Sequence, residues 1–226
     1  MSLQGAVIAF DLDGTLVDTA GDLVGAVNSV LTEQGLQPAP QDVGRAMIGN
    51  GVRALVLRAF AHAGETLEDG RADAMVERFI EVYRGRIAQV STTYPGVAET
   101  LDRLLAEGAR LAVCTNKRTD LSIALLDALG LTACFAAVAG SDLVAHKPDP
   151  RLLHYAIAHA GGSSGRAVFV GDSYVDQATA RAAGVPVIGI TFGYSAEPLK
   201  PGDFDALVGR FSEIPAAAEA LIGAAA

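Results

Sequence analysis

The sequence predicts an α/β protein in which helices flank a parallel β-sheet and an all-helical segment is inserted after the first strand. Three observations lead to this prediction. From residue 94 onward, short apolar runs alternate with helical patterns, which is typical of a parallel sheet with right-handed crossovers. Residues 17–91 show helical spacing and no convincing strand. An apolar run at residues 6–10 precedes that segment, so the segment separates the first strand from the rest of the sheet.

The first predicted strand ends abruptly in two acids. Ala6–Phe10 runs directly into Asp11-Leu12-Asp13-Gly14-Thr15, as expected where a buried strand enters a loop. Two carboxylates one residue apart raise each other's pKa unless a cation or hydrogen-bond donors offset the repulsion. We therefore interpret Asp11 and Asp13 as a functional pair, with metal ligand, nucleophile and acid/base as the candidate roles.

The inserted segment is predicted to consist of helices. Its first helix has an apolar face, and Thr19 with Asp22 resembles a capping box at its start, with Gly35 at its end. Further helices are predicted over residues 41–47, 51–63 and 68–88. The return to the sheet is placed at Tyr94-Pro95-Gly96. The predicted domains are a core of residues 1–16 and 92–226 and a helical domain of residues 17–91.

The remaining strands of the core alternate with helices. Strands are predicted over residues 111–114, 136–139, 167–170 and 187–190. Helices are predicted over residues 97–107, from about 121 to 129, from Pro150, and from about 172 to 183. The only low-complexity tract is the alanine-rich C-terminus.

Polar clusters follow four of the predicted strands. They are Asp11 with Asp13, Thr115 with Asn116, Lys147 in a Lys-Pro-Asp-Pro loop, and Asp172 with Asp176. The carboxyl ends of parallel strands lie at one edge of a sheet, where ligands bind. We therefore expect these four clusters to converge on a single site.

The chemistry of the clusters favours a phosphate site with a metal ion. Asp11, Asp13 and Asp172 supply only oxygen ligands, which favour Mg²⁺. Thr115, Asn116 and Lys147 supply donors suited to phosphate oxygens. A cation and a lysine around a phosphoryl group neutralise its charge, which is the main requirement of phosphoryl transfer.

Composition limits the possible partners. The 226-residue chain has a formal net charge of −9, which disfavours binding to nucleic acid or an anionic membrane through bulk electrostatics. Cys114 and Cys134 form neither a disulfide framework nor a metal-ligand spacing. No segment has the length of a membrane span or the features of a signal peptide. We expect a cytoplasmic protein, a monomer or homodimer, that acts on a small phosphorylated metabolite.

These four motifs, in this order, resemble those of the haloacid dehalogenase superfamily, in its phosphatase branch with a helical cap. Among its members the chain is most similar to bacterial phosphoglycolate phosphatases. The resemblance implies a Rossmann-like core, Asp11 as nucleophile and Asp13 as general acid/base. It also implies Mg²⁺ held by Asp11, the main-chain carbonyl of Asp13, and Asp172. Thr115 and Lys147 would bind the phosphoryl group, with Asp176 supporting the site from behind these ligands.

The helical segment offers further candidates for substrate binding. Ile48-Gly49-Asn50-Gly51 resembles the cap loop that reaches over the active site in phosphoglycolate phosphatases, and glycine permits close backbone approach. Arg53 is a candidate partner for a substrate carboxylate. The segment has no lysine, which argues against the Schiff-base chemistry of phosphonoacetaldehyde hydrolases.

The resemblance therefore implies hydrolysis of a small phosphate monoester, with 2-phosphoglycolate as the leading substrate. Asp13 distinguishes the chain from the dehalogenases, which lack this second aspartate. Another sugar phosphate or pyrophosphate stays open as the substrate. A non-catalytic, phosphometabolite-binding regulatory protein is the alternative of another class, although the intact Asp11 and Asp13 argue against it.

Overall fold

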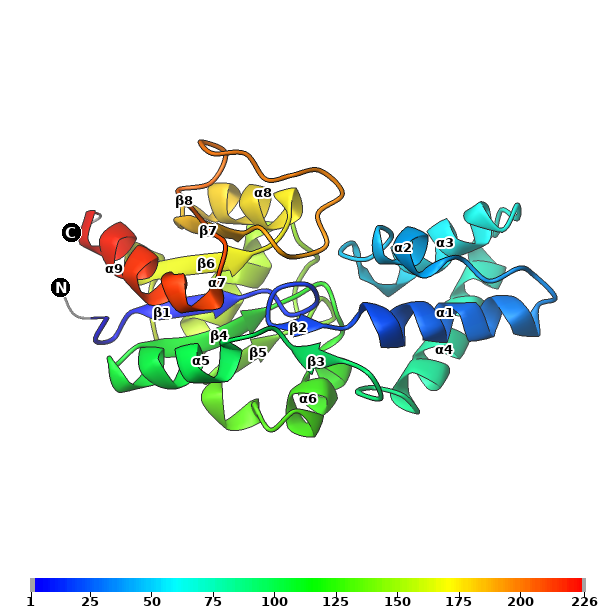
Figure 1. The fold of residues 1–226 in the computed structure, drawn as a ribbon, viewed down its shortest axis with the longest axis horizontal. Coiled ribbons are helices and arrows are strands. Elements are labelled where there is room, and N and C mark those ends of the chain that lie inside the picture. The colour runs from blue at the N-terminus through cyan, green and yellow to red at the C-terminus, as the bar shows by residue number, and fades with distance from the viewer. Residues whose placement is uncertain (1–2, 225–226) are drawn as a thin grey trace.

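The computed structural model describes residues 3–224 and confirms the predicted α/β fold (Figure 1). A six-stranded parallel sheet has the strand order β5-β4-β1-β6-β7-β8. Its strands are β1 (Val7–Phe10), β4 (Arg110–Cys114), β5 (Ala137–Ala139), β6 (Ala167–Gly171), β7 (Val187–Ile190) and β8 (Ala206–Val208). The central position of β1 explains its uninterrupted apolar sequence, since every residue of this strand is buried.

Helices cover both faces of the sheet, and β1 contributes alternately to the two layers. Ile8 and Phe10 belong to the apolar layer formed with α5 (Val97–Ala106), α6 (Thr119–Ala128) and α9 (Ile214–Ala224). Val7 and Ala9 belong to the layer formed with α7 (Pro150–His159) and α8 (Tyr174–Ala183). The period of two along a strand produces this division. Short 3₁₀ turns lie at Thr132–Cys134, Ser164–Arg166 and Phe211–Glu213.

The helices of the inserted segment pack around an apolar core of their own. They are α1 (Ala20–Glu33), α2 (Gln41–Arg45), α3 (Gly51–His62) and α4 (Asp69–Arg84). Leu31, Phe60 and Phe79 are fully buried in this core, and Leu121 of α6 joins it from the sheet side. Figure 1 shows the four helices beyond the end of the sheet toward which β1 runs. They therefore lie over the carboxyl ends of the strands.

The expectation that residues 17–91 contain no strand is wrong at one end. β2 (Val17–Asp18) pairs antiparallel with β3 (Thr92–Thr93), so the chain leaves and re-enters the core through adjacent strands. A two-residue strand is too short for an alternating pattern to reveal.

Two local predictions for the helical segment also fail. The capping box at Thr19 and Asp22 is absent: the Thr19 hydroxyl donates to Asp13, and Asp22 accepts from the backbone N–H groups of Val90 and Ser91. Partners distant in sequence have replaced the local ones. The last helix ends at Arg84 and not at residue 88.

The C-terminal part of the core was not predicted. β8 is a three-residue edge strand, and α9 is formed by the alanine-rich sequence. Ile214, Ala218 and Ile222 of α9 are buried against the sheet. Tertiary packing therefore stabilises a helix whose alanine-rich sequence shows little amphipathic pattern. Among residues 3–224, no helix has both the length and the apolar character needed to cross a bilayer.

Candidate active site

The structure brings the predicted polar clusters together at the carboxyl edge of the sheet. Asp11 is the first residue after β1, and its backbone N–H donates to the carbonyl of Val170 at 2.9 Å, which extends the pairing with β6. Asp172 follows β6 directly, and Thr115 follows β4. The loops therefore start from adjacent strands, which fixes the distances between their first residues.

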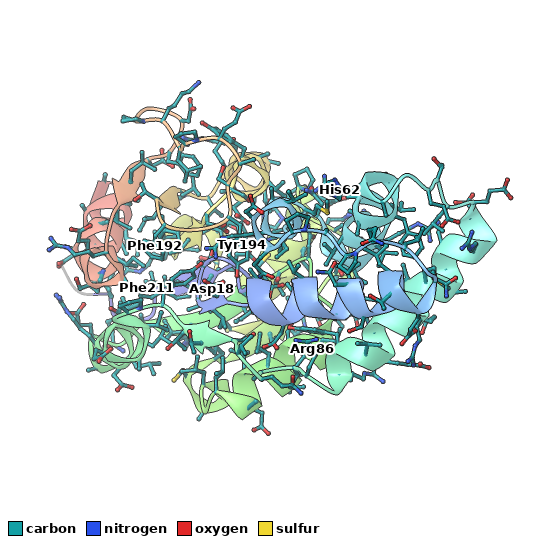
Figure 2. All side chains as sticks on the ribbon, turned by 45° about the vertical axis from the view of Figure 1, so that its right-hand side comes forward. Asp18, His62, Arg86, Phe192, Tyr194 and Phe211 are labelled. Carbon is teal, nitrogen blue, oxygen red and sulfur yellow. The ribbon has the colours of Figure 1, made fainter. Side chains whose placement is uncertain are left out.

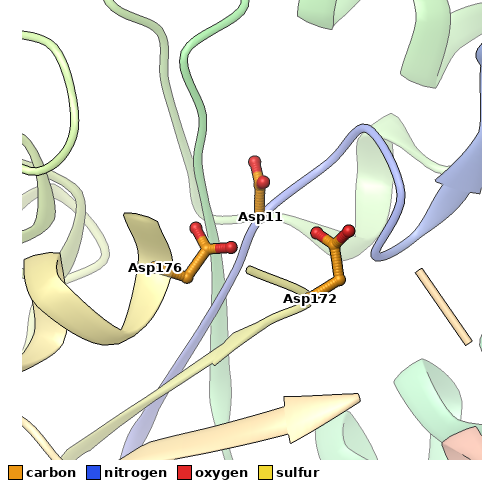
Figure 3. Close-up of side chains that lie close together, drawn as sticks. All are labelled: Asp11, Asp172 and Asp176. Carbon is orange, nitrogen blue, oxygen red and sulfur yellow. The ribbon is translucent and has the colours of Figure 1, made fainter. Parts of the chain in front are cut away.

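Three buried carboxylates form the centre of the site. Asp11, Asp172 and Asp176 each place one oxygen within 4.8 Å of the others, and Figure 3 shows the three side chains gathered together. Burial raises the pKa of Asp11 to about 6. Burial, together with the charges of Asp176 and Asp11, raises the pKa of Asp172 to about 7. Burial and mutual repulsion thus make it unfavourable for all three carboxylates to be charged near neutral pH without additional positive charge.

Lys147 neutralises one side of the cluster. Its Nζ lies 2.8 Å from Asp11 Oδ1 and 2.7 Å from Asp176 Oδ1, and its side chain is 1% exposed. Burial acts to lower the pKa of Lys147, but the two carboxylates outweigh that effect and raise the pKa overall. Lys147 is therefore a permanent cation beside Asp11.

Asp172 is held by residues from two other loops. Thr15 donates its hydroxyl to Asp172 Oδ1 at 3.0 Å, and the backbone N–H of Tyr194 donates to Oδ2 at 2.6 Å. A Cβ on Gly193 would lie 2.1 Å from the Cβ of Asp172, so only glycine permits this approach. The loop after β7 is a part of the site that sequence analysis missed. A Gly-Tyr pair just beyond a predicted strand was the available signal.

Tyr194 also connects this loop to the start of the helical segment. Its hydroxyl donates to Asp18 Oδ1 at 2.7 Å and accepts from the backbone N–H groups of Thr19 and Ala20 at 2.5 and 2.9 Å. Figure 2 shows Tyr194 and Asp18 near the beginning of α1. The guanidinium of Arg45 stacks over the Tyr194 ring, 4.5 Å from its centroid, and forms an ion pair with Asp18 at 3.1 Å.

The donor set fits a divalent cation with oxygen ligands. The oxygens of Asp11 and Asp172 lie within 4.8 Å of each other, and a cation between them would favour the charged forms of both acids, whose pKa values burial raises. Asp176 is already engaged: Oδ1 accepts from Lys147, and Oδ2 accepts from the backbone N–H and hydroxyl of Ser173 in a capping box of α8. The supporting role of Asp176 stays a prediction.

The side chain of Asp13 lies away from the three-acid cluster and contacts Lys117. Lys117 Nζ lies 2.9 and 3.0 Å from the two carboxylate oxygens of Asp13, and Thr19 donates its hydroxyl to Oδ1 at 2.8 Å. Lys117 is buried, and its ammonium lies 4.6 Å from the ring centroid of Tyr83 in α4. Sequence analysis did not select Lys117, although it directly follows Thr115-Asn116.

Thr115 and Asn116 are buried at the same edge but make different contacts. Thr115 lines the cavity beside Asp11, and its hydroxyl accepts from the backbone N–H of Lys117 at 3.2 Å. Asn116 donates its amide to the carbonyls of Gly49 and Lys147 at 3.2 and 3.3 Å and accepts from the Lys147 N–H at 2.8 Å. The Asn116 side chain therefore joins the helical segment to the loop that carries Lys147.

The helical segment reaches the site through its Gly49-Asn50-Gly51 loop. Gly49 and Asn50 line a cavity that contains Asp11 and Asp172, and Gly49 and Gly51 adopt φ values of +111° and +83° that favour glycine. Arg53 is not brought to the site, because its guanidinium pairs with Asp69 and Asp73 on the surface of the segment. The arginine that lines the cavity is Arg58, five residues later on the same helix.

Comparison with known proteins identifies the family of the chain. Residues 8–190 match the haloacid dehalogenase-like hydrolase family. A phosphoglycolate phosphatase of Caulobacter vibrioides is 51% identical over 97% of this chain and 93% of its own. A phosphoglycolate phosphatase of Agrobacterium fabrum is 45% identical over 96% of this chain and 95% of its own. The crystal structure of a predicted phosphoglycolate phosphatase from Haemophilus somnus superposes with a TM-score of 0.87 at 33% identity, covering 96% of this chain and 98% of that one. The predicted resemblance is thereby confirmed, as is the prediction of an enzyme, and the chain belongs to the haloacid dehalogenase-like hydrolase family.

Proposed function

We propose that this hydrolase is a Mg²⁺-dependent phosphatase that converts 2-phosphoglycolate to glycolate and phosphate. The observation that carries the proposal is the position of Asp11, which lies between Lys147 and Asp172 at a cavity that opens toward the helical segment. The relatives from Caulobacter vibrioides and Agrobacterium fabrum, which are named phosphoglycolate phosphatases, support the choice of substrate.

The residues divide the reaction into two displacements. The Asp11 carboxylate attacks phosphorus while the ester P–O bond breaks, which gives an aspartyl phosphate, and Asp13 protonates the leaving oxygen. Asp13 then takes a proton from water, whose oxygen attacks phosphorus. The P–O bond to Asp11 breaks, and phosphate is released. Lys147 and Thr115 bind the phosphoryl oxygens throughout.

The metal site would use Asp11, the main-chain carbonyl of Asp13, and Asp172, with Asp176 behind them. When bound, Mg²⁺ supplies positive charge that stabilises the phosphoryl oxygens during transfer. The protein's own part is to hold the two acids in position: the Lys147 ion pair holds Asp11, and the Thr15 and Tyr194 contacts hold Asp172.

A substrate panel tests the proposal. Purified protein with Mg²⁺ is assayed for phosphate release from 2-phosphoglycolate, several sugar phosphates and pyrophosphate, and kcat/KM is compared across the panel. The proposal predicts the highest kcat/KM for 2-phosphoglycolate. A higher value for a sugar phosphate or pyrophosphate would reassign the substrate. Binding of these compounds without any turnover would favour the regulatory alternative.

Three sequence-based expectations stay predictions. They are a cytoplasmic location, a monomeric or homodimeric state, and the boundaries of the cap domain at residues 17 and 91. The absence of nucleic-acid and membrane partners likewise rests on the net charge of −9.

A further inference from the structure

Two cavities meet at Asp11, Asp13 and Gly49, and they differ in size and lining. The larger, about 350 Å³, extends past Asp172 toward Arg58 and Glu197. The smaller, about 30 Å³, lies on the other side of Asp13, between Lys117 and the helical segment. A space of this size holds one or two water-sized groups, so it suits a small substituent and not a sugar ring.

The smaller cavity contains two buried groups that the reaction chemistry does not use. Lys117 is 4% exposed. Its ammonium has three N–H donors and contacts both carboxylate oxygens of Asp13, which leaves one donor for another acceptor. The hydroxyl of Tyr83 is buried and has no acceptor for its proton among the described residues. A buried hydroxyl donor without an acceptor lowers the folding stability. A bound ligand that accepts from Tyr83 would remove this cost. Burial raises the pKa of Tyr83 to about 12, against the opposing effect of Lys117, which keeps the hydroxyl protonated.

The rest of the lining combines apolar side chains with the polar residues Asp11, Asp13, Thr115 and Asn116. Val52 and Leu55 of α3 and Leu121 of α6 close the smaller cavity around Lys117 and Tyr83. A buried ammonium and a buried hydroxyl beside these apolar side chains match a small anion, because a charge-assisted hydrogen bond is stronger where water is excluded. Asp11 and Asp13 both line this cavity, and in the proposed reaction Asp13 lies beside the leaving oxygen.

We propose that Lys117 and Tyr83 bind a carboxylate on the leaving group and thereby select phosphate esters of small hydroxy acids. The inference rests on the proposed function, since it takes Asp11 as nucleophile and Asp13 as the group beside the leaving oxygen. A carboxylate one carbon from the ester-bearing oxygen would enter the smaller cavity, while the phosphoryl group stays over Asp11. Lys117 and Tyr83 are then specificity-determining residues contributed by the sheet edge and by the helical segment, respectively.

Two esters that differ in one group provide the test. These are 2-phosphoglycolate and 2-hydroxyethyl phosphate, in which CH₂OH replaces the carboxylate. The ratio of their kcat/KM values is measured for the wild type and for Lys117→Gln, Tyr83→Phe, Arg58→Gln and Lys200→Gln. Arg58→Gln removes the cation of the larger cavity, and Lys200→Gln removes an exposed lysine outside both cavities.

The wild type should prefer 2-phosphoglycolate. Lys117→Gln should lower that preference on the order of 10²-fold and Tyr83→Phe about tenfold, the range expected for lost hydrogen bonds to a charged group. Arg58→Gln and Lys200→Gln should keep it. Circular dichroism checks the fold of each variant, and Tyr83→Phe keeps the test valid if Lys117→Gln does not fold.

Other results would overturn the inference. An equal loss for both esters in Lys117→Gln would mean that Lys117 only positions Asp13. Loss of the preference in Arg58→Gln would place the carboxylate in the larger cavity. A wild-type enzyme that cleaves both esters equally well would refute carboxylate selection and leave the phosphatase function intact. Cleavage of neither ester would refute the inference together with its underlying assignment of 2-phosphoglycolate.

Discussion

The carboxyl edge of the sheet and the helices α1–α4 use the same charged residue types in different ways. At the sheet edge the charges are buried and contact one another, as Lys147 does with Asp11 and Asp176. Apart from the buried Asp22, which lies 3.6 Å from Arg86, the helices carry ion pairs at the surface, as in Arg53 with Asp69, whose side chain is 99% exposed. Removing one partner of a buried pair is strongly destabilising, whereas a surface pair contributes about 0–1 kcal/mol. Equal substitutions should therefore have very unequal effects in the two regions.

The largest expected effect is that of Asp11→Asn. Loss of the nucleophile should reduce kcat by at least about 10³-fold, while the fold is retained because asparagine has nearly the same shape. Initial rates of phosphate release and circular dichroism measure the two properties. The exposed Asp102→Asn serves as the matched control. Activity close to that of the wild type in Asp11→Asn would contradict the assignment of the nucleophile.

Lys147→Met should lower both activity and stability. It leaves the buried carboxylates of Asp11 and Asp176 without their cation, at a cost of about 3–5 kcal/mol in the free energy of unfolding, and it removes a phosphoryl ligand. Urea denaturation measures the first effect and kcat/KM the second. Lys200→Met, at an exposed position, should change neither. A stable Lys147→Met protein would show that the buried acids need no partner.

The metal should matter more as pH rises. The pKa of Asp172 is raised from 3.8 to about 7 in the folded protein, so between about pH 4 and 7 the folded state holds a proton that the unfolded chain has lost. The stability of the metal-free protein should consequently fall as pH rises through this window. Mg²⁺ needs the charged carboxylate, so it should raise Tm more at about pH 8 than at about pH 5. Thermal melts with EDTA or Mg²⁺ test this, and an equal Mg²⁺ effect at both pH values would contradict it.

Arg53→Gln should have the smallest effect. Its guanidinium contacts only Asp69 and Asp73 on the surface among the partners described for it, so the free energy of unfolding should change by no more than about 0.5 kcal/mol. The kcat/KM should stay within about twofold of wild type, because Arg53 makes no contact at the cavity and its loss removes no substrate-binding energy. A large rise in KM would show that Arg53 reaches the substrate when the helices move.

The sequence was informative where a pattern and a chemical requirement coincide. Apolar runs that end in Asp11, Thr115 and Asp172 marked both the strands and the edge at which they meet, because the order of a parallel sheet follows from its crossovers. Lys117 and Tyr194 were not found, because their contacts depend on which loops fold next to each other. Arg53 and Arg58 lie five residues apart on α3, and only the packing of that helix determines which of them lines the cavity.

Tyr194 fixes the point at which the helical segment leaves the core. One phenolic oxygen can donate once and accept twice, and the contacts to Asp18, Thr19 and Ala20 use that whole capacity. Its backbone N–H is engaged at the same time by Asp172. Hydrogen bonds thus tie residues 18–20 to the loop whose backbone also contacts Asp172, a proposed metal ligand. Any swing of α1 about these residues must break hydrogen bonds for which the tyrosine has no spare donor or acceptor.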